Sequence, residues 1–522
     1  MPDFPPHPGP ISSGERGNSG HWLLVICIVA LAAVLRFIFI SANEAHFDEI
    51  WYLEISTGRG EAHSQLPINQ LVPSVPDFTS LTGAPPWHAI YTHMSGQPHP
   101  PLHPLLLRGW RELFGESLPA GRMLSAVLSA LCVLVMFDAV RQISRPSVAL
   151  WAALLLALSS AQVQQAQEIR QYTLLTLMAL CAADALLRIE RSGPSFGRAI
   201  ALLASLLGML FTHYFALPAI VAMGVYAVVR LRGRSRGVAL LTVAVAAAVF
   251  TAAWGPMIPR QAAAFAANSA PGVYGDSSAV ADHFRLTLHD LATAPLRLLF
   301  DPRPDNALVA VLSGSVLALP WLVLRRSPQL LLWAIWLTAV IGFALVLDLT
   351  RSTRHLSMVR HFILAGPALC AILPQLVGDT RRPLLANGFP ALLSLCCAAA
   401  LGLTYTRPAV RLSGIAELLA DAHGTNEPIV FYTDPPMTWW GQWLCLSSMH
   451  YAHDAFPRPV AILDRPADSQ LVASLRRFGG AWIVSAGTPL HPTQMLPGCK
   501  VISTHEEPFV ASVTHVQWVD PP

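Results

Sequence analysis

Long apolar segments recur along the chain from about residue 22 to residue 405, and short polar segments separate them. A helix needs about 20 mainly apolar residues to cross a membrane, with a range of about 17 to 25. The candidate spans are residues 22–41, 122–140, 148–161, 169–187, 199–211, 215–229, 238–257, 307–324, 330–347, 362–377 and 384–405. The pattern therefore predicts a polytopic α-helical membrane protein with about eleven transmembrane helices.

After residue 405 the pattern changes. Short apolar runs at 428–433 and 481–485 alternate with Pro, Gly and Asp, and residues 471–478 have helical spacing. This alternation is typical of a small α/β domain. We expect a disordered tail over residues 1–20, a transmembrane domain over 21–405 and an extracytoplasmic α/β domain over 406–522.

The composition agrees with a membrane protein. Of the 522 residues, 53% are hydrophobic and 12% charged, whereas soluble domains carry about 25% charged residues. The net charge of +3 is too small to indicate nucleic acid as a partner. The first apolar segment is long for a signal peptide and no small-residue cleavage site follows it, so we expect a retained helix.

Clusters of arginine predict the orientation, because Lys and Arg are retained on the cytoplasmic side. They occupy alternate polar segments, at 141–145, 188–198, 230–236, 325–326 and 381–382. This pattern puts the N-terminus in the cytoplasm and the C-terminal domain outside. The outer segments are then 42–119, 161–168, the turn at His213, 258–304, 349–361 and the region after residue 406. The compact loops and the lack of a eukaryotic sorting signal favour a bacterial inner membrane.

Most cysteines lie in apolar segments and are expected to be small buried residues. Only Cys445 and Cys499 fall outside the predicted helices. If the C-terminal domain is exported, they either form a disulfide or remain free, and the sequence leaves both alternatives open.

Four polar motifs stand at the ends of predicted spans on the outer side. They are His46-Phe47-Asp48-Glu49, His99-Pro100-Pro101, Gln167-Glu168-Ile169-Arg170 and Thr212-His213-Tyr214. Ionisable groups near lipid are costly and usually functional. Their gathering on one face predicts a reaction centre at the membrane surface.

Each motif also has a structural interpretation. Asp48 can serve as a general base, or it can be a carboxylate held by a neighbouring arginine. Glu168 stands where a helix dipole favours an acid without any catalytic role. A single histidine such as His213 is more often structural than catalytic. Residues 99–115 fit an amphipathic helix on the outer surface, with aromatic residues at the headgroup level.

The outer segment 349–361 departs from the charge rule. It carries Arg351, Arg354 and Arg360 together with His355 and His361. Basic residues on the side that normally excludes them suggest an anionic ligand, and phosphate is the natural candidate. The alternative is a solvated loop that touches lipid headgroups.

Together the motifs resemble those of a known family. The sequences FDE at 47–49, HPPLHPLLLRGWRELFGES at 99–117, AQEIRQY at 166–172 and THYF at 212–215, with Arg122 opening the second span, resemble glycosyltransferase family 39. This group of GT-C membrane enzymes includes the protein O-mannosyltransferases and is similar to the aminoarabinose transferases of lipid A. The resemblance covers roughly residues 20–260.

The resemblance implies an inverting transfer of a sugar from a polyprenyl-phosphate donor at the outer face, with mannosyl transfer as one option. Asp48 would activate the acceptor, and Glu49 would support it or contact acceptor or metal. A divalent cation, Mg²⁺ or Mn²⁺, stays open as a cofactor, with Asp48, Glu49 and Glu168 as candidate ligands. The candidate residues for binding the donor and its phosphate are His99, Glu168, Arg170, Tyr172, His213, Tyr214, Arg354 and Arg360.

Two other functions compete with the transferase. A transporter or flippase of a lipid-linked substrate would also carry many spans, but transporters often show inverted repeats and charges at the membrane midplane, and neither is visible here. A non-catalytic sensor with a transferase-like core would not need the acidic motifs. The expected partners are a polyprenyl-phosphate sugar, membrane lipids and an acceptor that the sequence does not identify.

Overall fold

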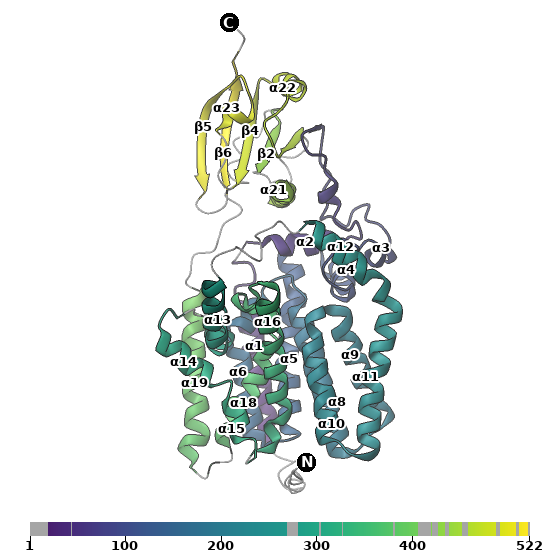
Figure 1. Cartoon of the computed structure of the whole chain (residues 1–522), viewed down its shortest axis with the longest axis vertical. Helices are drawn as coiled ribbons and strands as arrows, with labels where there is room; N and C mark the ends of the chain where they lie inside the picture. Colours follow the sequence, from purple (N-terminus) through teal and green to yellow (C-terminus); the bar gives the residue numbers. More distant parts are fainter. Residues whose placement is uncertain are drawn as a thin grey trace.

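The computed structural model divides into a helical bundle and a smaller domain that contains a sheet, which stands at one end of the bundle (Figure 1). The structure describes residues 19–42, 44–268, 280–301, 304–325, 327–378, 380, 382–405, 419, 426–433, 438–451, 458–486, 491–507 and 511–519. Most of the predicted tail, Arg326, Arg381 and most of the segment 406–425 lie outside these residues.

Apolar helices form the bundle at the positions where spans were expected. Five are long enough to cross a membrane: Leu118–Arg141 (α5), Tyr172–Ser192 (α8), Gly233–Ala264, which contains α11 (Gly233–Trp254), Pro328–Arg351, which contains α16 (Leu331–Arg351), and Pro383–Tyr405 (α19). Shorter apolar helices are His21–Phe37 within α1 (Ser19–Phe37), Phe196–Thr212 (α9), Tyr214–Arg230, which contains α10 (Leu217–Arg230), Ala307–Val323, which contains α14 (Ala307–Ser315) and α15 (Leu319–Val323), and Ala365–Gly378 (α18). The predicted polytopic helical class is confirmed, whereas the number of spans and their orientation remain predictions.

One expected span is broken. Helices α6 (Pro146–Leu158) and α7 (Ser160–Ala166) meet at an angle of 58°. A helix end leaves carbonyl groups without partners, and here the fully buried Arg36 of α1 donates hydrogen bonds to the carbonyls of Leu156 and Ala157. The Ser159 hydroxyl accepts a hydrogen bond from the Gln162 amide and so caps α7. The break directs the chain into the polar segment that precedes α8.

Further helices lie toward the end of the bundle that faces the smaller domain. Four are short, namely α2 (Phe47–Ser56), α3 (His88–Thr92), α4 (Leu102–Phe114) and α12 (Ile258–Asn268), whereas α13 (Val280–Phe300) has 21 residues. Helix α4 is the amphipathic helix expected over 99–115. The segment 258–304, expected as a loop, contains two helices instead. The sequence did not predict α13 as a span, because its polar residues interrupt the apolar run that a span would show.

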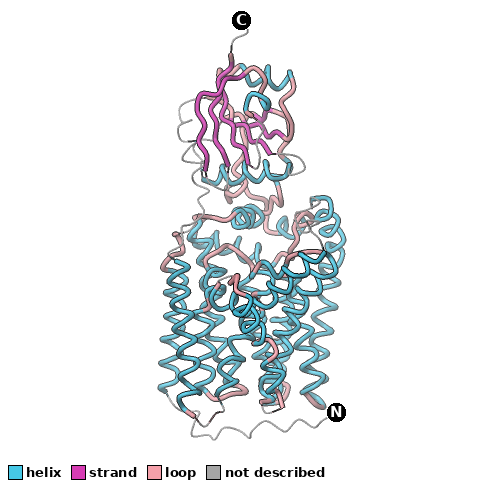
Figure 2. The backbone as a smooth tube through the Cα atoms, turned by 60° about the vertical axis from the view of Figure 1, so that its left-hand side comes forward, coloured by secondary structure: helices cyan, strands magenta, loops and turns pink. Residues whose placement is uncertain are grey.

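The smaller domain is built on a six-stranded sheet in the order β1-β3-β2-β4-β6-β5 (Figure 2). The strands are β1 (Leu71–Val72), β2 (Ile429–Thr433), β3 (Val460–Leu463), β4 (Gly480–Ala486), β5 (Cys499–Glu507) and β6 (Ala511–Trp518). Strand β2 runs parallel to β3 and β4, and the remaining pairs are antiparallel. The strands and the helix expected near 428–433, 481–485 and 471–478 are present as β2, β4 and α22 (Ser469–Arg476).

Strand β1 comes from the first outer segment, 42–119, and not from the C-terminal region. It pairs antiparallel with β3, with Leu71 opposite Ala461. Helix α21 (Thr438–Tyr451) reinforces this link, since the Gln442 amide donates to the carbonyls of Ser64 and Leu66. The first outer segment and the C-terminal region therefore share one sheet.

Neither of the two cysteines outside the predicted spans, Cys445 and Cys499, takes part in a disulfide in the described structure. Cys445 packs with Phe431 and Val484, whereas Cys499 packs with Tyr432 and Ile483. Successive residues of a strand point to opposite faces, so the two thiols lie on opposite faces of the sheet. This arrangement favours the alternative without a disulfide.

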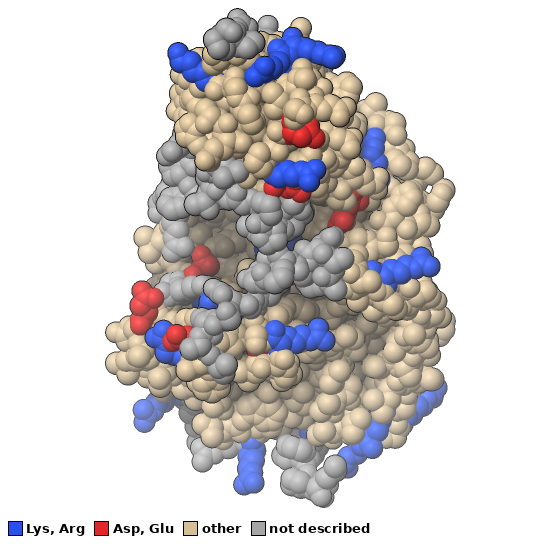
Figure 3. Space-filling view, turned by 45° about the horizontal axis from the view of Figure 1, so that its top comes forward, with Lys and Arg blue, Asp and Glu red and all other residues tan. Residues whose placement is uncertain are grey.

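Helix α21 also joins the sheet domain to the bundle. The indole ring of Trp443 lies 5.1 Å from that of Trp51 in α2 and 5.1 Å from the ring of His63. Figure 3 shows the recess that opens between the two parts, with acidic and basic side chains visible at its edges. Helix α2 therefore lies beneath the sheet domain.

Candidate active site

Asp48 is the centre of a charged cluster on the first turn of α2. Its carboxylate forms ion pairs with Arg170, in the segment that precedes α8, and with Arg360 of α17 (Val359–Phe362), the latter at 3.1 Å. Arg170 is 4% exposed, and the Asp48 side chain is 22% exposed. Two arginines that are 122 and 312 positions away in the sequence thus converge on one carboxylate.

The cluster keeps Asp48 ionised. Burial alone would raise the pKa of Asp48, but Arg170, His46 and Arg360 outweigh it and hold that pKa well below its usual range. The carboxylate is therefore negatively charged at neutral pH and is a weak base while both arginines are bound to it.

Glu49, the next residue, has a different environment. Its carboxylate is 1% exposed and accepts two hydrogen bonds of 2.8 Å from the guanidinium of Arg122. It also accepts from the backbone amides of His46 and Ile169, at 2.8 and 2.9 Å. These contacts occupy both oxygens, and they tie α2, α5 and the segment before α8 together. Glu49 thus positions its neighbours Asp48 and Arg170.

Glu168 and Tyr172 flank Arg170 in sequence. Glu168 is half-buried, and burial raises its pKa even though Arg170 opposes this effect. The Arg170 guanidinium lies 5.3 Å from the centre of the Tyr172 ring and donates to its hydroxyl at 3.4 Å. Both residues therefore lie where the sequence placed them, next to the arginine that binds Asp48.

The predicted histidines His99 and His213 meet in the structure, although 114 residues separate them in sequence. Their ring centres are 4.3 Å apart, and the His213 ring lies 5.6 Å from that of Tyr172. Burial lowers the pKa of His99 to about 3 and that of His213 well below its usual value, and the nearby Arg170 contributes to both shifts. Both imidazoles are therefore neutral at physiological pH.

Tyr214 has a supporting position. Its hydroxyl accepts a hydrogen bond from the Trp254 indole at 3.0 Å and donates to the Gln261 side chain at 2.5 Å. Gln261 in turn donates to the carbonyls of Met94 and His99. Tyr214 therefore holds the segment that carries His99, and it does not contact the Asp48 cluster directly.

The basic segment 349–361 is anchored by Asp348, which accepts hydrogen bonds from the backbone amides of His355 and Leu356. Of the two arginines that were predicted to bind phosphate, Arg360 reaches Asp48. Arg354 instead pairs with Asp290 of α13 at 3.2 Å, and its side chain is 42% exposed. The structure thus separates the two arginines.

Sequence reasoning missed two residues of this centre. Tyr52 follows Asp48 by one helical turn, is 3% exposed, and its hydroxyl has no hydrogen-bond partner within the described chain. The i, i+4 spacing was the available signal. His361, noted only as part of a basic segment, has its ring 4.9 Å from that of His355 and 5.5 Å from that of Phe215.

The three candidate metal ligands do not form a ligand set. Asp48 is bound to arginines, and both oxygens of Glu49 are occupied by Arg122 and backbone amides. Across the described part of the chain, no three Asp, Glu, His or Cys side chains converge as a divalent cation would need. The donor groups present therefore do not fit a resident cation.

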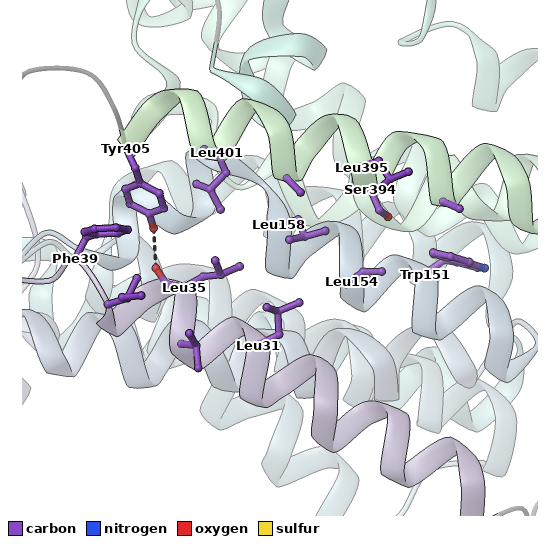
Figure 4. A pocket seen from close by; sticks show the side chains of 15 residues that line it. Leu31, Leu35, Phe39, Trp151, Leu154, Leu158, Ser394, Leu395, Leu401 and Tyr405 are labelled. Carbon is purple, nitrogen blue, oxygen red and sulfur yellow. Dashed lines mark hydrogen bonds between the residues drawn. The ribbon is translucent and has the colours of Figure 1, made fainter.

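An apolar groove of about 630 Å³ lies between α1, α6 and α19 (Figure 4). Leu31, Leu154 and Leu395 line it, and Phe39 and Tyr405 stand at the end that is nearest the site. The Tyr405 hydroxyl donates to the carbonyl of Leu35 and accepts from Gln167, the residue before Glu168. The groove thus ends at a residue that binds Gln167, three positions before Arg170 in the sequence.

The site region overlaps a known sequence family. Residues 98–254 match the family model described as dolichyl-phosphate-mannose-protein mannosyltransferase. This range contains His99, Arg170 and His213, while Asp48 and Arg360 fall outside it. A comparison with curated proteins finds no match.

The fold is similar to that of solved membrane proteins. The apo structure of ArnT from Cupriavidus metallidurans aligns with a TM-score of 0.57 and 16% identity over 95% of this chain and 98% of that protein. ArnT from the same organism bound to undecaprenyl phosphate aligns with a TM-score of 0.53 and 15% identity, over the same shares of both chains. The chain therefore resembles the GT-C membrane glycosyltransferases, in fold over nearly its whole length and in sequence over residues 98–254.

Proposed function

We propose that this protein is an inverting glycosyltransferase that moves a sugar from a polyprenyl-phosphate donor to an acceptor at the extracytoplasmic face of the membrane. One observation carries the proposal: Asp48 is held at the end of the helical bundle by two arginines, Arg170 and Arg360. Such a group combines a base for the acceptor with cations for a phosphate leaving group.

The phosphate of the donor would compete with Asp48 for the two arginines. A guanidinium binds phosphate as well as it binds carboxylate. When the donor binds, the positive charge beside Asp48 is shared with the phosphate, and the pKa of Asp48 rises from its depressed value. The base therefore becomes effective only when the donor is in place.

The reaction then needs one displacement. Asp48 accepts the proton of an acceptor hydroxyl or amine, and the oxygen or nitrogen bonds to the anomeric carbon from the face opposite the phosphate. The bond between that carbon and the phosphate oxygen breaks, and its electron pair leaves on polyprenyl phosphate. Arg170 and Arg360 stabilise the released charge. Because no cation ligand set forms among the described residues, no step in this scheme is assigned to a metal.

The groove between α1, α6 and α19 supports a lipid-linked donor. Its lining is apolar, so it suits a hydrocarbon chain and not a sugar. Because the groove ends at Tyr405, which binds Gln167, a chain lying in it would bring its phosphate next to Glu168 and Arg170. We assign the groove to the first isoprene units of the donor.

The comparisons support this proposal at the level of reaction class. The fold matches a protein whose solved structure contains undecaprenyl phosphate, and the family model is named for a dolichyl-phosphate-mannose donor. The sugar, the acceptor and the length of the polyprenyl chain are not specified by either comparison.

The experiment is a transfer assay with purified protein in detergent. A panel of polyprenyl-phosphate sugars, each with a radiolabelled sugar, is incubated with membrane extracts as the source of acceptor. We expect one donor to release polyprenyl phosphate with wild type, and Asp48→Asn to reduce this release about 100-fold or more. Comparable turnover by Asp48→Asn would contradict the role of Asp48.

A second arm tests the competing function. The same protein is reconstituted in liposomes, and movement of each lipid-linked sugar between leaflets is followed. Flux without turnover of any donor would establish a transporter or flippase in place of the transferase. Turnover without flux supports the transferase.

A further inference from the structure

Three histidines beside the charged cluster share a property that the proposed phosphate chemistry does not use. The buried ring nitrogens His99 Nδ1, His213 Nε2 and His361 Nδ1 have no hydrogen-bond partner within the described chain. The same holds for the Tyr52 hydroxyl and for Nε of Arg170. Buried polar groups are nearly always paired, so a concentration of unpaired ones indicates a missing ligand.

Most of these groups lie on rings that follow one another in space. The rings of His99 and His213 are 4.3 Å apart, and that of His99 is stacked against Tyr52 at 6.5 Å. Phe215 lies between His213 and His361, at 5.1 and 5.5 Å from their ring centres. The unpaired atoms therefore belong to a continuous row of rings, which begins next to the arginine that binds Asp48.

The tautomer of His213 is defined by its surroundings. Its Nδ1 accepts a hydrogen bond of 2.9 Å from the Phe215 amide, so the proton of the neutral ring is on Nε2. That nitrogen is a hydrogen-bond donor for which the described residues provide no acceptor. The ligand must therefore offer an oxygen at this position.

The protonation states of the histidines indicate which chemical groups the ligand can present to them. Burial lowers the pKa of both His99 and His361 to about 3, with Arg360 contributing to each. A neutral imidazole has one donor and one acceptor nitrogen, which matches a hydroxyl group and offers little to an anion. The anion is served by Arg170 and Arg360, and the same two cations disfavour a positively charged amino group.

We propose that His99, His213, His361 and Tyr52 form a subsite that binds the hydroxyl groups of an uncharged sugar on the donor through hydrogen bonds. The aromatic rings between them offer apolar faces to the C–H groups of the sugar ring. The phosphate lies between the two arginines, and the sugar extends from it along the row of histidines. This inference rests on the proposed donor, but it predicts binding and not turnover.

The test measures how much the sugar increases the affinity of the protein for undecaprenyl phosphate. Undecaprenyl phosphate and its arabinose, mannose, glucose and aminoarabinose derivatives are titrated against the purified protein in detergent, with tryptophan fluorescence as the readout. We expect at least one neutral sugar to improve binding over bare undecaprenyl phosphate by about tenfold, and aminoarabinose to bind more weakly than arabinose.

The variants separate the sugar from the phosphate. His213→Phe should bring the ratio between the sugar-bearing and the bare lipid close to one and leave the affinity for bare undecaprenyl phosphate nearly unchanged. Arg170→Gln should weaken both lipids alike. His93→Gln is the matched control, because His93 is exposed and its ring contacts the Gly58 carbonyl away from the row.

Two outcomes would overturn the inference. Either no sugar improves binding to wild type, or His213→Phe retains the full ratio. Failure of the proposed function looks different, since it would appear as absent turnover while the sugar-dependent binding persists. If His213→Phe folds poorly, His99→Gln and His361→Gln replace it, since both keep a polar side chain. Each should lower the ratio between the affinities for the sugar-bearing and the bare lipid.

Discussion

Two carboxylates, Asp48 near one end of α5 and Asp138 near its other end, are each bound by arginines, and the two clusters differ in more than charge. At one end Asp48 binds Arg170 and Arg360. At the other end Asp138 binds Arg141 and Arg188. Both carboxylates have side chains that are 22% exposed and both pair with two arginines.

The difference lies in the polar groups around them. Around Asp138, Asp184 pairs with Arg188 at 2.7 Å, and one buried oxygen of Asp184 lacks a partner in the described structure. Around Asp48, buried atoms without a partner in the described structure belong to five side chains on different elements, namely Tyr52, His99, Arg170, His213 and His361. Charge at a membrane face is thus a weak sign of function, whereas unpaired polar groups around a charge are a strong one.

The largest expected effect is on the free energy of unfolding, which should fall far more when Arg122 of α5 is replaced than when Arg141 of the same helix is replaced. Arg122 is 1% exposed and bound to Glu49, so Arg122→Met leaves the buried Glu49 carboxylate without a cationic partner and should cost about 3 to 5 kcal/mol. Arg141 is 35% exposed, and Arg141→Met should cost no more than about 1 kcal/mol. Thermal unfolding in detergent measures both. Equal losses would contradict the structural role of the Glu49 pair.

The second effect is on catalysis. Asp48→Asn should lower transfer about 100-fold or more, while Asp138→Asn, with the same number of arginine partners, should retain nearly wild-type turnover per folded molecule. Initial rates with the donor identified from the panel, corrected for the folded fraction, provide the measurement. If the two variants lose activity equally, the distinction between the clusters fails.

The third effect concerns pH. Arg360 helps to hold the pKa of Asp48 low, so Arg360→Gln should raise that pKa. Since the base must be ionised, the acid limb of kcat/KM then moves to higher pH, and KM for the donor rises about tenfold. Arg354→Gln is the control, because Arg354 pairs with Asp290. An unchanged acid limb in Arg360→Gln would speak against Asp48 as the base.

The smallest effect tests the groove. Ala398 lines it, so Ala398→Trp should fill part of the groove and raise KM severalfold for a long-chain donor but not for a short-chain analogue. Leu392→Trp places the same side chain on α19 outside the groove, where Leu392 is 61% exposed. The measurement is the ratio of the KM for the long-chain donor to the KM for the short-chain analogue, which should rise in Ala398→Trp but not in Leu392→Trp. The same ratio in both variants would remove the groove from the donor site.

The sequence by itself predicted the helical bundle and the face that carries the site. Apolar periodicity located the spans, and their polar ends put Asp48, Arg170 and His213 on one side of the membrane. It also predicted the α/β character of the C-terminal region. These properties follow from neighbours along the chain, which local patterns encode.

Only the tertiary structure decided how the polar residues pair. In the folded protein Glu49 pairs with Arg122, and Asp48 pairs with Arg360. Arg354 pairs with Asp290 instead. The tertiary structure also added β1 to a sheet whose other strands lie more than 350 residues later. These pairings join residues from 73 positions apart, for Glu49 and Arg122, to 390 positions apart, for Leu71 and Ala461. They depend on how helices pack and bend, as at the break between α6 and α7. The physical reason is that a hydrogen bond depends on distance in space, and hydropathy along the chain does not specify that distance.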